Sequence, residues 1–338
     1  MIIIQSYWLA ILFCIFAMVC WGSWQNTQKM VQTGWRFELF YWDLAIGIII
    51  LATFAAFTVG SLGGAGRTFL EDISQAELSS ILYAMLGGLL WNMGNLLMVA
   101  AVAIAGMSVA FPIGGGIAWI LGIILNYINI SMKGGIPTNF PALMWIGVGV
   151  IIVAIVLSGK SYANLTKIKE KTSLKGILLS VLAGTFIAFF YPVVVNSLDP
   201  SFVESGKGTL TPYSGVFFMA VGIVISTAVI NPFFMRKPVE GPPVKMKMYT
   251  TGSAKTHLLG MLGGGIWALG TIFSYMAVGA ANPAIAYALS NAAPVIAILW
   301  GLFVWKEFKG APKGTNLLLA IMFIAYIVGL ILITISNA

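Results

Sequence analysis

Long continuous apolar stretches recur along the whole chain and constrain its fold more than any other feature. Ten can be placed, at residues 7–25, 39–59, 79–103, 107–128, 141–158, 176–197, 213–235, 257–280, 283–304 and 316–335. An α-helix needs roughly 20 such residues to cross a bilayer. Barrel strands would be about ten residues long and would alternate apolar with polar positions. The sequence therefore predicts an all-α polytopic membrane protein with ten transmembrane helices.

Composition agrees with this interpretation. Hydrophobic residues make up 59% of the chain, charged residues 8%, and the mean hydropathy is +0.97. A soluble domain has about 25% charged residues, so that class of protein is excluded. The first residues, MIIIQSYW, contain no basic region, and we interpret them as the start of the first helix and not as a cleaved signal peptide.

The Lys and Arg residues mark one side of the predicted helices. When successive loops are assigned to alternate sides, 15 of these residues fall on one side and 3, Arg67, Lys133 and Lys207, on the other. Positive residues are retained in the cytoplasm, so both termini are predicted to be extracytoplasmic. The basic residues do not form a stripe with interleaved aromatics, and no nucleic-acid partner is expected.

One motif occurs twice, near the middle of each half. Residues 86–97 read LGGLLWNMGNLL and residues 262–273 read LGGGIWALGTIF, at an offset of 176. With five predicted helices in each half, the second copy enters the bilayer from the opposite side, as in the inverted repeats of secondary transporters. We predict a first five-helix repeat at 1–160, a basic cytoplasmic linker at 161–175 and a second five-helix repeat at 176–338.

Aromatic and polar side chains follow these helices at a spacing of four residues. Trp91 and Asn95 share one helix face, and Trp267 and Thr271 repeat that spacing in the second copy. Inverted copies would bring such faces to one central cavity. The predicted substrate-contacting residues are Trp91, Asn95, Trp267, Thr271, Tyr275, Tyr287, Asn291, Trp21, Gln25 and Tyr191. The alternative is that the glycines and amides serve only helix packing and interhelical hydrogen bonds.

A cavity of this kind suits a small neutral polar substrate. Indole faces stack on the C–H face of a polyol, while Asn, Gln and Tyr exchange hydrogen bonds with its hydroxyls. The predicted spans contain no Lys or Arg that would clamp a phosphate or carboxylate. We therefore expect a sugar or a similar polyol.

One carboxyl group lies inside a predicted span, at Asp43 in the segment ELFYWDLAIG. An ionisable group at such depth is a functional candidate, because burial makes binding and release of a proton possible. We predict that Asp43 carries a coupling proton. The alternative is an interfacial Asp that caps a neighbouring helix or pairs with Arg36 or Lys29.

The segments GGLLWNMGNLL…GMSVAFPIGGG and GGGIWALGTIFSYMAVG resemble the bacterial sugar porters of the drug/metabolite transporter superfamily. The most similar groups are the glucose/ribose porters and the L-rhamnose–proton symporters, with the plant ureide permeases as cousins. The resemblance covers nearly the whole chain. It implies two inverted five-helix repeats, alternating access and proton-coupled sugar uptake across the bacterial inner membrane.

The central loop departs from the ureide branch, whose members have a long cytoplasmic loop with a phosphate-loop-like sequence. Here the loop spans only about residues 159–175, and its SGKS lacks the glycine that a phosphate loop needs five positions earlier. This weakens the ureide or nucleobase permease interpretation, which stays an alternative. A drug or amino-acid exporter of the same superfamily is the other.

An enzyme is not expected. His257 is the sole histidine and lies at a helix end, Cys14 and Cys20 share one helix, and Asp43 has no second carboxylate at its depth. We expect no metal, no cofactor other than the coupling proton and no obligate protein partner, with membrane lipid around the helices.

Overall fold

The computed structural model describes residues 1–165, 174–199, 207–239 and 241–338. Its described part contains ten helical spans long and apolar enough to cross a membrane, which confirms the predicted fold class. Six are single helices: α3 (Phe37–Phe57), α8 (Pro141–Ala163), α9 (Leu174–Val195), α10 (Pro212–Arg236), α12 (Ala254–Ala281) and α15 (Thr315–Ile335). Another is α5 (Leu78–Ala105), whose end is followed by the short α6 (Met107–Ala110).

The remaining three spans are interrupted. They are α1 (Tyr7–Ser23) with α2 (Asn26–Lys29), η1 (Phe111–Gly115) with α7 (Gly116–Met132), and α13 (Pro283–Ser290) with α14 (Pro294–Leu299) and η2 (Trp300–Val304). Two further short helices, α4 (Phe69–Gln75) and α11 (Met246–Tyr249), lie in connections between spans. The predicted linker at 161–175 lies outside the described residues over 166–173.

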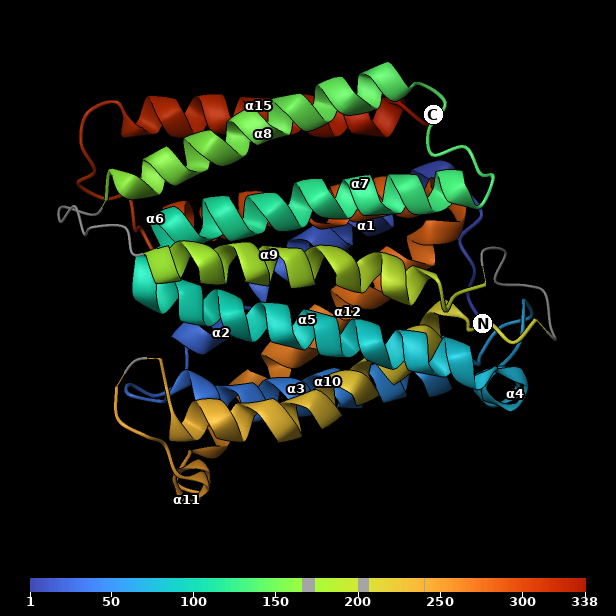
Figure 1. Ribbon diagram of the computed structural model, residues 1–338, viewed down its shortest axis with the longest axis horizontal. Helices are drawn as coiled ribbons and strands as arrows, with labels where there is room; N and C mark the ends of the chain where they lie inside the picture. The colour runs from blue at the N-terminus through green and yellow to red at the C-terminus, as the bar shows by residue number, and fades with distance from the viewer. Residues whose placement is uncertain (166–173, 200–206, 240) are drawn as a thin grey trace.

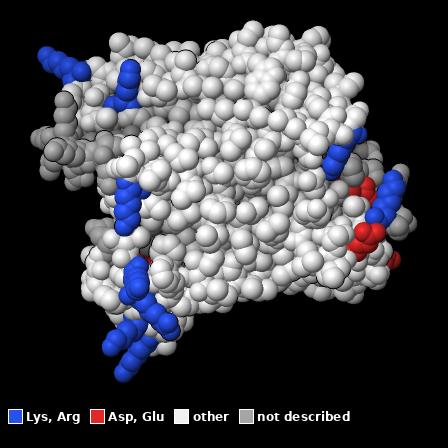
Figure 2. All heavy atoms as spheres, in the orientation of Figure 1, with Lys and Arg blue, Asp and Glu red and all other residues white. Residues whose placement is uncertain are grey.

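The two ends of the molecule differ in charge. Both termini lie at the same end (Figure 1), which we call the terminal end. The loop that contains Arg67 also belongs to it, because the Met1 amino group donates to the Ala65 carbonyl at 2.7 Å. Figure 2 shows most Lys and Arg side chains at the opposite end, here called the basic end, where Lys29 and Arg236 lie. An uncharged band separates the two ends, as the surface of a membrane-spanning protein requires.

The repeated glycines bring helices from opposite halves into backbone contact. A Cβ at Gly88 of α5 would lie 2.1 Å from the Met219 carbonyl oxygen of α10, and a Cβ at Gly264 of α12 would lie 2.0 Å from the Leu44 oxygen of α3. Only glycine permits this approach, which supports the packing role expected of small residues in membrane helices. The predicted division into two repeats, like their inversion, stays a prediction.

Two spans have irregular backbone, one inside the span and one at its start. Helix α13 ends at Ser290, a turn follows at 291–293, and α14 begins with Pro294, which has no N–H to give to the Ser290 carbonyl. In the first half, the π-helical η1 contains Pro112 and precedes α7. Interruptions of this kind in membrane helices occur where the backbone borders a cavity or packs against other protein.

Candidate functional site

A cavity of about 540 Å³ lies between the two halves and includes both irregular segments in its wall. The wall is formed by α1, α2, the start of α3, α5, the η1–α7 segment, α8, the turn at 291–293, α14 and α15. Lys29 and Glu307 border it at the basic end, where their side chains are 48% and 26% exposed. The cavity therefore reaches solvent at the basic end of the molecule.

Three packed indoles lie beside this cavity, and one of them, Trp21, lines it. Trp21 lines the wall, and the Trp267 ring lies behind it at 6.5 Å with an interplanar angle of 19°. Trp91 packs on Trp267 with ring centroids 4.0 Å apart. Trp21 Nε1 donates to the Trp267 carbonyl at 3.2 Å and to Thr271 Oγ1 at 3.3 Å. The indole at the wall thus has a fixed orientation and presents a flat apolar surface to the cavity.

Uncharged amides supply hydrogen-bonding groups in the same wall, which includes Gln25, Asn26, Gln28, Asn95 and Asn291. Asn95 Nδ2 donates to Tyr41 Oη at 3.2 Å, and Asn291 Nδ2 donates to the Tyr287 carbonyl at 3.2 Å. In the described part of the chain, their Oδ1 atoms accept no hydrogen bond, and Gln25 is exposed in the cavity. These groups are available to a solute's hydroxyl or N–H donors.

Asn92 has a different role from Asn95. It is fully buried, accepts from Tyr41 Oη at 2.6 Å and donates to Ser226 Oγ at 2.8 Å. Asn92 therefore joins α5 to α3 and α10, as an interhelical hydrogen bond does. Tyr41 connects the two amides, because the same hydroxyl accepts from Asn95.

The predicted substrate-contacting residues fall into three groups. Four line the cavity: Trp21, Gln25, Asn95 and Asn291. Three lie in the indole layer next to it: Trp91, Trp267 and Thr271. The remaining three, Tyr191, Tyr275 and Tyr287, are fully buried and do not line the cavity, because they contact one another nearer the terminal end. The direct contact of any of them with a solute stays a prediction.

Several wall residues were missed by the repeat pattern. Trp119 of α7 lines the cavity and donates to the Ala288 carbonyl at 3.0 Å, while Ser158 of α8 and Tyr326 of α15 complete the opposite wall. None belongs to the repeated motif. Trp119 follows the segment FPIGGG by three residues, and that irregular segment was the available signal.

The ion pair at the mouth is held by aromatic contacts. Lys29 Nζ contacts Glu307 Oε1 and lies 5.3 Å from the Trp305 ring centroid, a cation–π distance. Trp305 Nε1 donates to Asn26 Oδ1 at 2.5 Å. Lys29 and Glu307 are the charged residues that line the cavity within the described ranges, and they compensate each other.

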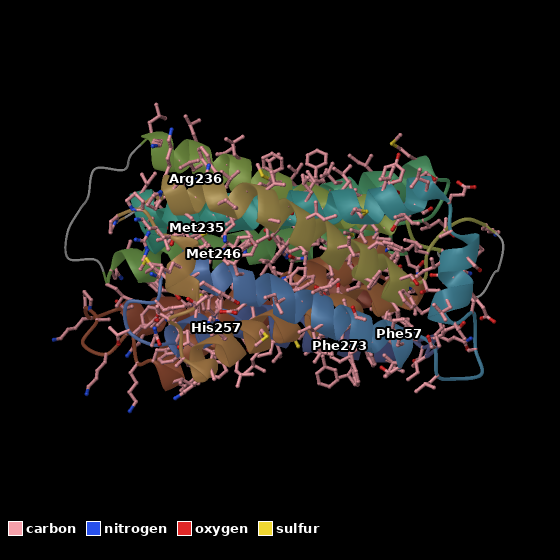
Figure 3. The ribbon with its side chains drawn as sticks, turned by 90° about the horizontal axis from the view of Figure 1, so that it is seen from below. Phe57, Met235, Arg236, Met246, His257 and Phe273 are labelled. Carbon is pink, nitrogen blue, oxygen red and sulfur yellow. The ribbon has the colours of Figure 1, made fainter. Side chains whose placement is uncertain are left out.

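Asp43 has partners that the sequence did not indicate. It is 1% exposed, accepts from the Tyr249 hydroxyl of α11, and has His257 Nδ1 of α12 at 3.0 Å from both carboxyl oxygens. Figure 3 shows His257 on α12 toward the end where Met235, Arg236 and Met246 lie. Burial, followed by the contact with Asp43, raises the pKa of the Tyr249 hydroxyl, which keeps it a donor. Asp43 itself does not line the cavity.

The alternative pairing proposed for Asp43 is wrong. Arg36 Nη2 contacts Glu38 at 2.8 Å, and Lys29 contacts Glu307, so neither cation pairs with Asp43. His257, set aside as a histidine at a helix end, is the group that does. Gly260 makes this possible, because a Cβ there would lie 2.4 Å from the Asp43 Cβ.

Comparisons with known proteins point to membrane transport. A family model described as ureide permease matches residues 40–167 and 161–336. Ureide permease 1 of Arabidopsis thaliana is 23% identical over 391 residues, covering 100% of this chain and 99% of that protein. Glucose uptake protein GlcU of Bacillus subtilis is 25% identical over 239 residues, covering 69% and 71%. A solved crystal structure shares the fold, with a TM-score of 0.56 at 16% identity over 96% and 95% of the two chains.

Proposed function

The chain belongs to the ureide permease family, and we propose that it is a proton-coupled secondary transporter that takes up a small neutral polar solute by alternating access. The observation that carries this proposal is the wall of the cavity. It combines an oriented indole with five uncharged amides, and its charged groups within the described residues, Lys29 and Glu307, neutralise each other at the mouth. Such a wall favours a neutral solute over an ion.

Two solute classes fit this wall equally well. A sugar would lay its C–H face on Trp21 and exchange hydrogen bonds with Asn95 and Asn291. A ureide is planar, so it would stack on the same indole and pair its N–H groups with the amide oxygens. The sugar proposal has support from the similarity to a glucose uptake protein, and the ureide proposal from the family itself.

The cavity in this state opens at the basic end, and the buried tyrosines lie on its other side. If the basic end is cytoplasmic, as the charge distribution predicts, this is an inward-facing state. Uptake then requires a second state that opens at the terminal end. Two inverted repeats would supply it by exchanging their conformations around the site.

We propose Asp43 as the proton-carrying group, with His257 and Tyr249 as its partners. Asp43 lies two residues after Tyr41 on α3, and Tyr41 accepts from Asn95 in the cavity wall. Proton binding changes the attraction between Asp43 on α3 and His257 on α12. A shift of α3 relative to α12 would therefore move Tyr41, and with it the Asn95 side chain that contacts the solute.

Solute binding is tested with purified protein in a thermal-shift screen of neutral sugars and ureides. Asn95→Ala and Asn291→Ala should each weaken binding of the active solute by about 1–3 kcal/mol, the loss expected when a buried hydrogen bond is broken. Asn129→Ala is the control, since Asn129 donates to Asn196 at 2.9 Å outside the cavity. Unchanged affinity in both cavity variants would rule out this site.

Proton coupling is tested in proteoliposomes with an imposed pH gradient. Asp43→Asn should abolish uphill accumulation and leave solute counterflow largely intact, because exchange needs no net proton movement. Glu38→Gln is the control on the same helix, with a carboxylate that contacts Arg36. Accumulation by Asp43→Asn with the usual pH dependence would mean that coupling lies elsewhere or that transport is uniport.

A further inference from the structure

Three tyrosines from three helices form one stacked layer outside the cavity. Tyr191 of α9 lies parallel to Tyr275 of α12, with centroids 4.6 Å apart and an interplanar angle of 19°. Tyr287 of α13 meets Tyr191 edge-on at 5.1 Å. Each is near the end of its helix that lies at the terminal end of the molecule (Figure 1), and each is fully buried. The layer separates the cavity from that end.

The layer contains polar atoms that have no hydrogen-bond partner among the described residues. They include Tyr275 Oη and Ser290 Oγ, which are buried. Asn126 Oδ1 on α7 is also buried and unpartnered. It lies one turn beyond Gly122, on the helix face that meets Tyr287. A layer that served only packing would have apolar groups at these positions, because a buried polar group without a partner is unfavourable.

Tyr287 closes the layer against α7. Its hydroxyl donates to the Ala118 carbonyl at 2.6 Å, and its ring occupies the space above Gly122, where a Cβ would lie 2.2 Å from the ring. Glycine at this position is therefore a requirement of the closed arrangement and not of α7 itself. Tyr191 Oη, at 2.9 Å from Ser274 Oγ, joins α9 to α12 on the other side.

We propose that this tyrosine layer is the closed outer gate of the transport path, and that Tyr275, Ser290 and Asn126 line the path when it opens toward the terminal end. In the open state, water or the passing solute supplies the hydrogen bonds that these atoms lack in the closed state. The proposal rests on the proposed function, because only a transporter needs a second opening. The gate proposal adds to that function the route between the cavity and the terminal end, and the three polar side chains that a neutral solute meets along it.

Cys14 is a native reporter of this opening. It is fully buried on α1, which packs against α12 and α13, the helices that carry Tyr275 and Tyr287 of the layer. The chain has two cysteines, so Cys20→Ser leaves Cys14 as the sole thiol. A membrane-impermeant methanethiosulfonate, added at the terminal end of the reconstituted protein, forms a mixed disulfide with Cys14 and releases methanesulfinate. The rate is followed by mass spectrometry.

Two variants should change that rate in opposite directions. Tyr275→Phe removes an unpartnered hydroxyl from the closed layer, so the closed state gains population and labelling slows by about tenfold. Gly122→Ala forces the Tyr287 ring away, so the open state gains population and labelling accelerates. Gly149→Ala on α8 is the matched control, because a Cβ there meets nothing within 4 Å. Gly64→Cys, on an exposed loop at the terminal end, verifies that the reagent is active.

The proposal is overturned if Cys14 reacts only from the basic end, if it reacts from neither side in Gly122→Ala, or if Tyr275→Phe leaves its rate unchanged. Thermal unfolding of each variant establishes that it is folded. The labelling experiment needs no solute. If the labelling rates change as expected, the gate proposal is supported even when no sugar or ureide binds in the screens. Conversely, solute binding without labelling would leave the cavity proposal intact and reject this route.

Discussion

Gly264 and Gly265 are adjacent on α12, and replacing each of them with Ala should change the stability of the protein in opposite directions. Gly264 meets the backbone of α3, where an added Cβ would lie 2.0 Å from the Leu44 oxygen and 2.8 Å from the Ile48 nitrogen. Gly265 meets nothing within 4 Å. The two substitutions therefore share the same helix, depth and chemistry, and they differ only in what the new methyl group contacts.

The magnitude follows from two terms. Gly→Ala in a helix interior stabilises by about 1 kcal/mol through the backbone. At Gly264 this gain is opposed by overpacking, which costs typically about 1–3 kcal/mol and more where backbone must move. Ordinary contact needs roughly 3.5 Å, so α3 must move by more than about 1 Å. We expect a net loss of about 2 kcal/mol for Gly264→Ala and a gain of up to about 1 kcal/mol for Gly265→Ala.

Thermal unfolding followed by intrinsic tryptophan fluorescence measures this difference. By the scaling for domains of 150–250 residues, 2 kcal/mol corresponds to a fall in Tm of roughly 4–8 °C. Gly88→Ala should behave like Gly264→Ala, because its added Cβ would lie 2.1 Å from the Met219 oxygen of α10. If Gly88→Ala and Gly264→Ala both unfold at or above the wild-type temperature, the close helix approach described here is incorrect.

Three further outcomes are expected. A reporter that fluoresces only in the cytoplasm, fused after Ala338, should stay dark, because the basic end is predicted to be cytoplasmic; a bright fusion would reverse the orientation. Tyr249→Phe removes a hydrogen-bond donor to the anionic Asp43 carboxylate, so the pH optimum of accumulation should move to higher pH. An unchanged pH profile would mean that Tyr249 takes no part in proton coupling. Glu307→Gln should change the free energy of unfolding by less than about 1 kcal/mol, because the Lys29–Glu307 pair is partly exposed. Transport of a neutral solute should continue in this variant, and its loss would show that the pair has a functional role at the mouth of the cavity.

The sequence predicts the spans well because each transmembrane helix is specified locally. An apolar run of sufficient length is visible without knowledge of its neighbours, and the ten runs agree in number with the ten spans. The interruptions were less visible. The stretch at 283–304 reads as one apolar run, yet Asn291 and Pro294 divide it, because Pro294 removes one backbone hydrogen-bond donor.

The candidate site was predicted in part, for a physical reason. A spacing of four residues reports which side chains share a face on one helix, and this found Asn95 and Asn291. It does not report which faces of distant helices meet. His257 lies 214 residues from Asp43, and only the close crossing of α3 and α12 at Gly260 brings them together. The same limit applies to Tyr275, whose ring turns to Tyr191 and not to the cavity.

The difference between the two copies of the repeated motif now has a structural explanation. At the offset of 176, Asn92 corresponds to Ala268 and Asn95 to Thr271. In the first copy, both amides bind the Tyr41 hydroxyl, which ties the cavity wall to α3. In the second copy, Thr271 instead receives a hydrogen bond from Trp21 and fixes the indole of the opposite wall.

This asymmetry gives the two copies separate tasks. The first connects an amide of the wall to the helix that carries Asp43, while the second, on α12, carries His257 and orients an indole. Asp43 and His257 therefore join the helices that hold the two sides of the wall. If Asp43 carries the coupling proton, as proposed above, that proton would act on α3 and α12 together, and both an amide and an indole would shift relative to the solute. Two identical copies would bind a solute symmetrically, but they would lack this connection between a proton and the wall.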